Sequence, residues 1–363
     1  MTAHDAWMPF VEPAPAKINL FLQVNGRRND GYHDLESLVV FTAFGDALHL
    51  QPAAGLSLER TGPFATLLPD NPDEDLCLQA ARTLAAALGR DPGVTLTLEK
   101  NIPVAAGIGG GSSDAAAVLR ALCRVWQTDV GDPQVRDIAG QLGADVPVCL
   151  LGTTAEMRGI GDVIVPRSDD PELNLLLVNP NRPLSTASVF DALLDSDMTT
   201  VSLADPEPPG DAEAYLDIVS GRRNDLTRPA CDLCPEIGDV LTALSGLVDC
   251  RLARMSGSGP TCFGVFDGPE SCARAAAQLS DSHPGWWVCP TRTRAACCPS
   301  GGGCGGSCLM TDVTRPNLPS WSELPPAKSS VKVQPSCVWQ RVQKTSAVAI
   351  HPCASLLRWP LPT

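Results

Sequence analysis

The sequence predicts an α+β protein of two domains, each built from two layers of strands and helices. A chain of 363 residues with 44% hydrophobic residues can bury a large core, and chains of this length commonly divide. Residues 94–126 have the pattern of a strand, a glycine loop and a helix, and further strand patterns lie at 173–178 and within 250–266. We therefore expect one domain over residues 13–165 and a second over residues 170–294.

The most informative segment is the glycine loop at residues 103–113. Before it, Val94, Leu96 and Leu98 alternate with polar residues, which is the period of a half-buried strand. From Ala115 onward, apolar residues return at helical spacing. Such a loop leaves backbone N–H groups free at the positive end of a helix, and no side chains block an approaching anion. The sequence therefore predicts a phosphate site.

Two common phosphate-binding templates do not fit this loop. A Walker A loop requires a lysine followed by Ser or Thr, but no lysine lies between Lys100 and Lys328. The dinucleotide fingerprint fits Gly107 and Gly109 but meets Ser112 where its third glycine belongs.

A turn without any ligand remains open on the loop alone. Ser112 and Ser113 as helix N-caps, with Asp114 in the first turn, would also start an empty helix. The loop by itself does not decide between these interpretations.

Two further segments favour a ligand site. Residues 15–24 form an apolar strand in which Lys17, Asn19 and Phe21 share one face, opposite the apolar residues Ile18, Leu20 and Leu22. A lysine in such a strand is costly unless it is paired or functional. Residues 254–261 form a second glycine-serine turn between two strand-like runs.

Taken together, these segments resemble the GHMP kinase superfamily. The Pro-Ala-Lys-Ile-Asn-Leu run at 15–20, the Gly-Tyr-His run within 26–37 and Gly-Ala-Asp-Val-Pro at 143–147 narrow the resemblance. They point to the members that phosphorylate a methylerythritol carrying a cytidine diphosphate group, in the non-mevalonate route to isopentenyl diphosphate. The resemblance covers roughly residues 13–294 and implies a GHMP-kinase-like fold, with the active site in the cleft between two two-layer domains.

The resemblance implies that Lys17 and Asp145 form the catalytic pair. A carboxylate can take the proton of a hydroxyl group that attacks phosphorus, and a nearby ammonium offsets charge on the phosphoryl oxygens. Asn19, on the strand face of Lys17, could orient the substrate or either partner. The alternative for Asp145 is a helix N-cap or turn residue before Pro147, a common use of aspartate.

The resemblance also implies the binding residues. Tyr32 would stack on the cytosine ring, His33 would hydrogen-bond its edge, and Phe190 would lie on the other side, although Phe190 could equally be a core aromatic. The turn Gly257, Ser258 and Gly259 would shape the substrate site with backbone atoms. The ATP loop would comprise Pro103, Val104, Ala105, Ala106, Gly107, Ile108, Gly109, Gly110, Gly111, Ser112 and Ser113.

ATP is the implied cofactor, and Mg²⁺ is expected with it. The sequence assigns no magnesium ligand; Ser113 is a candidate only. The family often has glycine where Ala105 and Ala106 stand, which makes the start of this loop slightly bulkier.

Two other functions remain open. The first is another small-molecule kinase of the superfamily, such as homoserine or mevalonate kinase; the Gly31–His33 run argues against it. The second is a non-catalytic ligand sensor on the same fold, which the presence of both Lys17 and Asp145 argues against.

Composition excludes several other classes of partner. A net charge of −14, without basic stripes, argues against nucleic acid. No run of about 18 apolar residues is present, so we expect no membrane span. The first residues lack the pattern of a secretory signal, and the cysteines spread through residues 1–294 suit a reducing compartment. We expect a cytoplasmic protein with a small-molecule substrate.

Beyond residue 294 the composition changes. Residues 295–363 hold six of the 15 cysteines and nine prolines, with six Lys or Arg against two Asp or Glu. The spacing of Cys297, Cys298, Cys304 and Cys308 is atypical of a metal site, and no histidine lies near it. We expect a disordered extension rich in Cys, Pro and Gly.

Overall fold

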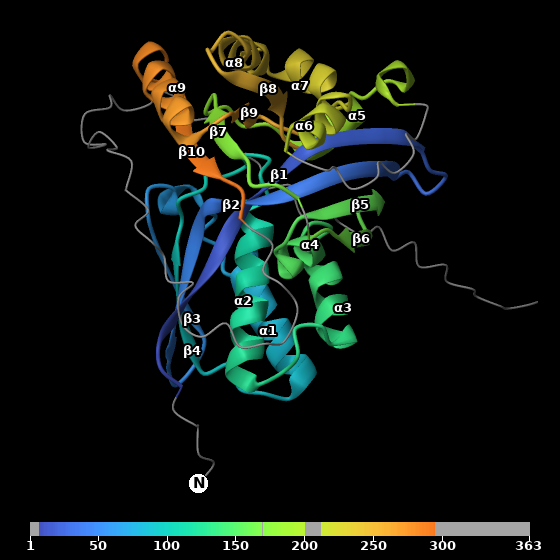
Figure 1. Cartoon of the computed structure of the whole chain (residues 1–363). Helices are drawn as coiled ribbons and strands as arrows, with labels where there is room; N and C mark the ends of the chain where they lie inside the picture. Colours follow the sequence, from blue (N-terminus) through green and yellow to red (C-terminus); the bar gives the residue numbers. More distant parts are fainter. Residues whose placement is uncertain (1–6, 169, 200–211, 295–363) are drawn as a thin grey trace, which may run out of the picture. The chain divides into compact units, whose positions relative to one another are not determined.

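The computed structural model describes residues 7–168, 170–199 and 212–294, which form two β-sheets with helices packed on them (Figure 1). The predicted extension at 295–363 lies outside the described residues. Among the described residues, no helix is both long and apolar enough to cross a membrane.

The first sheet is organised around a long antiparallel hairpin of β1 and β2. One edge of β2 pairs with β1, while its other edge pairs with β5 in its first half and with β4 in its second half. The strand order is β3-β4-β2-β5-β6, with β1 paired to β2. The strands are β1 Phe10–Arg27, β2 His33–Pro52, β3 Ser57–Thr61, β4 Val94–Glu99, β5 Ala155–Gly159 and β6 Val163–Pro166.

Four helices and one 3-10 turn accompany this sheet within the described residues. α2 packs against both strands of the hairpin and against α1, α3 and α4 (Figure 1). The bounds are α1 Leu76–Leu88, α2 Gly110–Trp126, α3 Pro133–Leu142, α4 Val146–Leu151 and the 3-10 turn Ala65–Leu67.

The second sheet has the order β10-β7-β9-β8. α8 and α9 pack on its strands. Its strands are β7 Asn174–Asn179, β8 Cys250–Met255, β9 Cys262–Phe266 and β10 Trp287–Arg292. The associated helices are α5 Thr186–Asp191, α6 Ala212–Ser220, α7 Thr227–Leu233, α8 Glu236–Ser245 and α9 Pro269–Ser282, with a 3-10 turn at Asp195–Asp197.

The predicted strand, glycine loop and helix are confirmed, but the predicted N-cap is wrong. β4 covers 94–99 with alternate residues buried, and α2 follows the loop. The N-cap of α2 is Gly109, whose φ of 69° lies in the left-handed region that glycine tolerates. Ser112 and Ser113 lie inside the helix, and Asp114 is buried there. Serines are a typical N-cap signal, but this helix begins after a glycine in the left-handed conformation and has no side-chain cap.

The predicted alternation of faces along β1 breaks after Asn19. The register with β2 shifts between Asn19 and Phe21, which is a β-bulge. Phe21 therefore joins the apolar cluster that contains Ile18 and Leu20, whereas Leu22 packs in a different cluster. A bulge adds one extra residue to the strand, so the side chains that follow it, up to the next irregularity between Val24 and Gly26, change face.

β1 contributes to the cores of both sheets. Its residues Leu22 and Val24 pack in one apolar cluster with Leu176 and Val178 of β7. The other strand of the hairpin is also tied to the second sheet, because Phe44 N–H donates to Thr291 Oγ1 at 3.1 Å. The predicted domain boundary between residues 165 and 170 stays a prediction.

Truncation after Arg294 is expected to leave folding and activity intact. Arg294 N–H donates to Phe41 O at 2.7 Å, and β10 ends at Arg292, so the truncated chain keeps every described helix and strand. The thermal unfolding midpoint and turnover of the truncated and full chains would be compared. A lower midpoint or lost turnover would show that residues 295–363 contribute to the fold.

Candidate active site

Lys17 and Asp145 lie together although they are distant in the sequence. Lys17 Nζ is 3.0 Å from Asp145 Oδ1 and donates to Asn19 Oδ1 at 3.2 Å. The Lys17 side chain is only 5% exposed, whereas the Asp145 side chain is 40% exposed. A buried ammonium needs such a partner, because burial of an unpaired charge is costly. The carboxylate is therefore both paired and accessible to a substrate.

The alternative interpretation of Asp145 as a capping residue is not supported by its contacts. Asp145 occupies the N-cap position of α4, with Pro147 in the first turn, but its side chain makes no capping hydrogen bond. An N-cap aspartate normally accepts a hydrogen bond from the backbone of the next turn. The side chain of Asp145 is paired with Lys17 instead.

The glycine loop lies directly against Lys17. Lys17 N–H donates to Ile108 O at 3.0 Å. A Cβ atom at Gly109 would lie 3.1 Å from Lys17 Cβ, so the absence of a side chain permits this approach. The predicted phosphate loop and the predicted catalytic lysine are thus neighbours.

The second glycine turn contacts the same loop through backbone atoms. A Cβ atom at Gly107, whose φ is 73°, would lie 2.0 Å from Gly259 O, so only glycine fits. Ala106 O accepts hydrogen bonds from Thr261 N at 3.3 Å and from its Oγ1 at 2.6 Å. Ala105, with a φ of 56°, adopts a conformation that favours glycine.

Asn19 is held by residues that the sequence analysis missed. Its Nδ2 donates to Ser37 Oγ at 2.8 Å, and its backbone N–H donates to Ser256 Oγ at 3.1 Å. Ser37 in turn donates to Phe21 O at 2.6 Å. These contacts fix the amide whose oxygen accepts from Lys17. Single serines within strands and turns carry no periodic signal.

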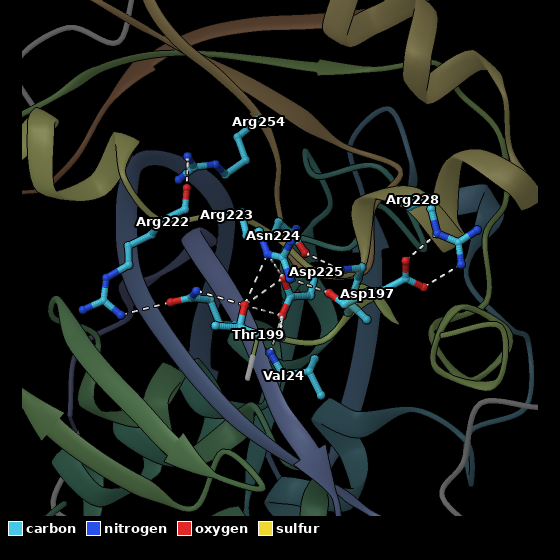
Figure 2. A network of polar contacts seen from close by, with 11 residues as sticks. Val24, Asp197, Thr199, Arg222, Arg223, Asn224, Asp225, Arg228 and Arg254 are labelled. Carbon is cyan, nitrogen blue, oxygen red and sulfur yellow. Dashed lines mark hydrogen bonds and ion pairs between the residues drawn. The ribbon is translucent and has the colours of Figure 1, made fainter. Parts of the chain in front are cut away.

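A polar segment at residues 222–225 joins β1 to the second glycine turn. Figure 2 shows its contact between Asp225 and Val24 of β1. Asn224 Nδ2 donates to Gly257 O at 2.8 Å, and Asp225 Oδ2 accepts from Val24 N–H at 2.8 Å. Arg254 Nη1 donates to Leu20 O at 2.7 Å, and burial lowers the pKa of Arg254 to about 10. The sequence signal that could have indicated this segment is the polar run Arg-Arg-Asn-Asp, which lies between α6 and α7.

Two of the three aromatic residues predicted for cytidine contact each other. The rings of His33 and Phe190 stack with centroids 5.2 Å apart, and Tyr32 in the hairpin turn is 44% exposed. Partial burial, assisted by Arg27 and opposed by Asp191, lowers the pKa of His33 below its usual 6.5. A neutral ring has one donor and one acceptor nitrogen, which suits the edge of a base.

The described residues give no metal centre. Among them, no group of three or more His, Cys, Asp or Glu side chains is arranged to hold a metal ion. Ser113, the candidate magnesium ligand, is fully buried and its hydroxyl donates to Pro15 O at 2.8 Å. Cys231 and Cys234 are free thiols.

Comparison with known proteins identifies the family. Residues 75–153 match the GHMP kinases N terminal domain, and residues 218–285 match the GHMP kinases C terminal domain. The 4-diphosphocytidyl-2-C-methyl-D-erythritol kinase of Paramagnetospirillum magneticum is 49% identical over 281 residues, covering 77% of this chain and 96% of that protein. The kinase of the same name from Paracoccus denitrificans is 50% identical over 277 residues, covering 76% and 94% respectively.

Solved structures agree with these relatives. A crystal structure of 4-(cytidine 5'-diphospho)-2C-methyl-D-erythritol kinase superposes with a TM-score of 0.64 at 36% identity, covering 78% of this chain and all (100%) of that one. Homoserine kinase from Cytophaga hutchinsonii, at 16% identity and a TM-score of 0.58 over 79% of this chain and 95% of that one, shares the fold alone. The predicted fold class and family resemblance are confirmed. The chain belongs to the GHMP kinases and, within them, to the small-molecule kinases of the 4-diphosphocytidyl-2-C-methyl-D-erythritol kinase family.

Proposed function

We propose that this protein transfers the γ-phosphoryl group of ATP to the C2 hydroxyl of 4-diphosphocytidyl-2-C-methyl-D-erythritol, giving the 2-phosphate and ADP. The observation that carries the proposal is the 3.0 Å ion pair of Lys17 and Asp145 beside the glycine loop. The relatives named as kinases of this substrate, at 49–50% identity, support the acceptor. The reaction would serve the non-mevalonate route to isopentenyl diphosphate.

The glycine loop would hold the triphosphate of ATP. The first backbone N–H groups of α2 have no partner within the helix, and they lie at its positive end. Gly109 and Gly110 precede and begin this helix, so no side chain shields these groups. Mg²⁺ bound to the phosphates would neutralise part of their charge. No residue of the chain is assigned to that ion.

The catalytic pair would act at the acceptor hydroxyl. Asp145 would accept the proton of the C2 hydroxyl as its oxygen attacks the γ-phosphorus. The new O–P bond forms while the bond from the γ-phosphorus to the bridging oxygen breaks, and ADP leaves with that electron pair. Lys17 would offset the negative charge on the transferred group, and Asn19 would keep the Lys17 ammonium in place through its 3.2 Å contact.

The cytidine group would bind at the hairpin end of β1 and β2. The stacked rings of His33 and Phe190 and the exposed ring of Tyr32 provide aromatic surface there. Ser258, whose hydroxyl lies 2.8 Å from Thr186 Oγ1, would connect the second glycine turn to the helix that carries Phe190.

A coupled ADP-release assay tests the proposal. Turnover is expected with the diphosphocytidyl substrate and not with homoserine or mevalonate. Turnover with either of the latter alone would assign a different acceptor. Absence of turnover with all three, together with retained binding of the cytidyl compound, would favour a ligand sensor.

Tyr32→Ala is expected to raise KM for the cytidyl substrate by about tenfold and to leave KM for ATP nearly unchanged. A stacking contact with a base contributes about 1–3 kcal/mol, which supports a change of this size. Steady-state kinetics with each substrate varied in turn would measure both constants. Tyr32→Phe, which keeps the ring, is the matched control and should behave like the wild type. Equal changes in both constants would contradict the cytidine assignment.

A further inference from the structure

A second lysine, Lys100, is buried next to the glycine loop and takes no part in the proposed chemistry. Its side chain is 3% exposed, and its Nζ lies 2.5 Å from Asp46 Oδ2 and 2.7 Å from Asp114 Oδ2. Asp46 belongs to β2 and Asp114 to α2, so the ammonium joins two elements to the end of β4. We call these three residues the buried triad.

Burying the three charged side chains of the triad in the protein interior costs free energy. Two carboxylates and one ammonium have lost their water, and one carboxylate oxygen, Asp114 Oδ1, has no hydrogen-bond partner among the described residues. Burial pulls the pKa of Lys100 down, but the two carboxylates outweigh it and raise that pKa above its usual value. A buried ion cluster often adds little to the stability of a protein. The position of the triad in the fold must therefore explain its presence.

The buried triad lies at the two ends of the glycine loop. Asp46 Oδ1 accepts hydrogen bonds from Asn101 N–H at 2.6 Å and from Ile102 N–H at 2.8 Å. These residues immediately precede Pro103, where the loop begins. Asp114 immediately follows Ser113, where the loop ends. One ammonium therefore ties together the entry and the exit of the loop.

Lys100 also lies against the backbone of the glycine loop. A Cβ atom at Gly110 would be 3.0 Å from Lys100 Nζ, just as one at Gly109 would be 3.1 Å from Lys17 Cβ. The consecutive residues Gly109 and Gly110 thus each lie against a lysine side chain.

From these contacts we infer that Lys100, Asp46 and Asp114 are positioning residues for the nucleotide: they close the glycine loop at both ends and fix its backbone N–H groups for the phosphates of ATP. This inference rests on the proposed function in one respect, the binding of ATP at this loop. Pre-ordered donors bind an anion more tightly because less conformational freedom is lost on binding. The effect should therefore appear in nucleotide affinity and not in affinity for the acceptor.

Isothermal titration of the full chain with a non-hydrolysable ATP analogue, and separately with the cytidyl substrate, tests this inference. Lys100→Met keeps the length of the side chain and removes its charge. We expect it to weaken binding of the analogue by about tenfold or more, and to leave binding of the cytidyl substrate within about twofold. Asp114→Asn keeps an oxygen that can accept from Lys100, so it should stay within about threefold of the wild type, whereas Asp114→Ala should resemble Lys100→Met.

Arg167→Met is the control for general loss of stability. Arg167 forms partly buried ion pairs with Glu156 of β5 and with Asp170. These residues are distant from the glycine loop in the sequence. We expect its nucleotide affinity to be unchanged.

Three results would overturn the inference: unchanged nucleotide affinity in a folded Lys100→Met, equal losses for both ligands, or an equal loss in Arg167→Met. If Lys100→Met does not fold, the contrast between Asp114→Asn and Asp114→Ala decides in the same way, and equal affinities in those two would reject the triad. Failure of the ATP binding on which this inference rests is recognised separately, because the wild type itself would then not bind the analogue. A different acceptor would instead be seen in the ADP-release assay.

Discussion

Replacing Asp145 with asparagine is expected to abolish phosphoryl transfer while leaving the affinity for ATP nearly unchanged. The substitution keeps the size of the side chain and removes the proton acceptor, which typically contributes 10²–10⁴-fold to the rate. Asp145 lies outside the glycine loop, and its side chain pairs with Lys17 at 3.0 Å. We therefore expect kcat to fall by roughly 10²–10⁴-fold and the dissociation constant of an ATP analogue to change by about twofold or less.

Single-turnover kinetics and calorimetric titration would measure the two quantities on the same preparation. Asp137→Asn, at an exposed position of α3, is a suitable control and should keep full activity. If Asp145→Asn retained most of its turnover, the proton acceptor would have to be another group, and the assignment of the catalytic pair would fail.

Replacing Gly107 with alanine is expected to damage both stability and activity. The new Cβ would lie 2.0 Å from Gly259 O, and the backbone at Gly107 has a φ of 73°, which alanine tolerates poorly. Strain and overpacking together should cost roughly 2–4 kcal/mol of unfolding free energy. Because the two glycine turns can no longer approach, kcat/KM should fall by about tenfold or more.

Denaturant unfolding and steady-state kinetics would record the two effects. Gly140→Ala provides a matched control, because a Cβ there meets nothing within 4 Å and the residue lies inside α3. This control should be neutral or more stable, since alanine favours a helix over glycine by about 1 kcal/mol. A Gly107→Ala protein as stable and active as the wild type would refute the close contact between the turns.

The sequence alone was sufficient to predict elements whose pattern is local and site residues that match a known family. The strand at 94–99 and the helix after the glycine loop have regular apolar periods, and both are present. The approach of Lys17 to Asp145 could not follow from periodicity, because the residues lie on separate elements; the family resemblance implied it.

The missed features have a common cause. Ser37, Ser256 and Asn224 act through single polar contacts with residues far away in the chain, and such contacts leave no local pattern. The faces of β1 were predicted wrongly after Asn19 because a bulge depends on the pairing of two strands. Asp114 was interpreted as a first-turn acid, whereas it pairs with Lys100 in the interior.

The continuity of β1 restricts how substrates can enter. Lys17 lies on this strand next to the glycine loop, and Leu22 and Val24 on the same strand are packed among residues of the second sheet. A hinge that swung the sheets apart as rigid bodies would have to tear these side chains out of an apolar core. We therefore expect admission of nucleotide and acceptor to depend on small local movements of surface turns, such as the tip that carries Tyr32, with the main framework staying still.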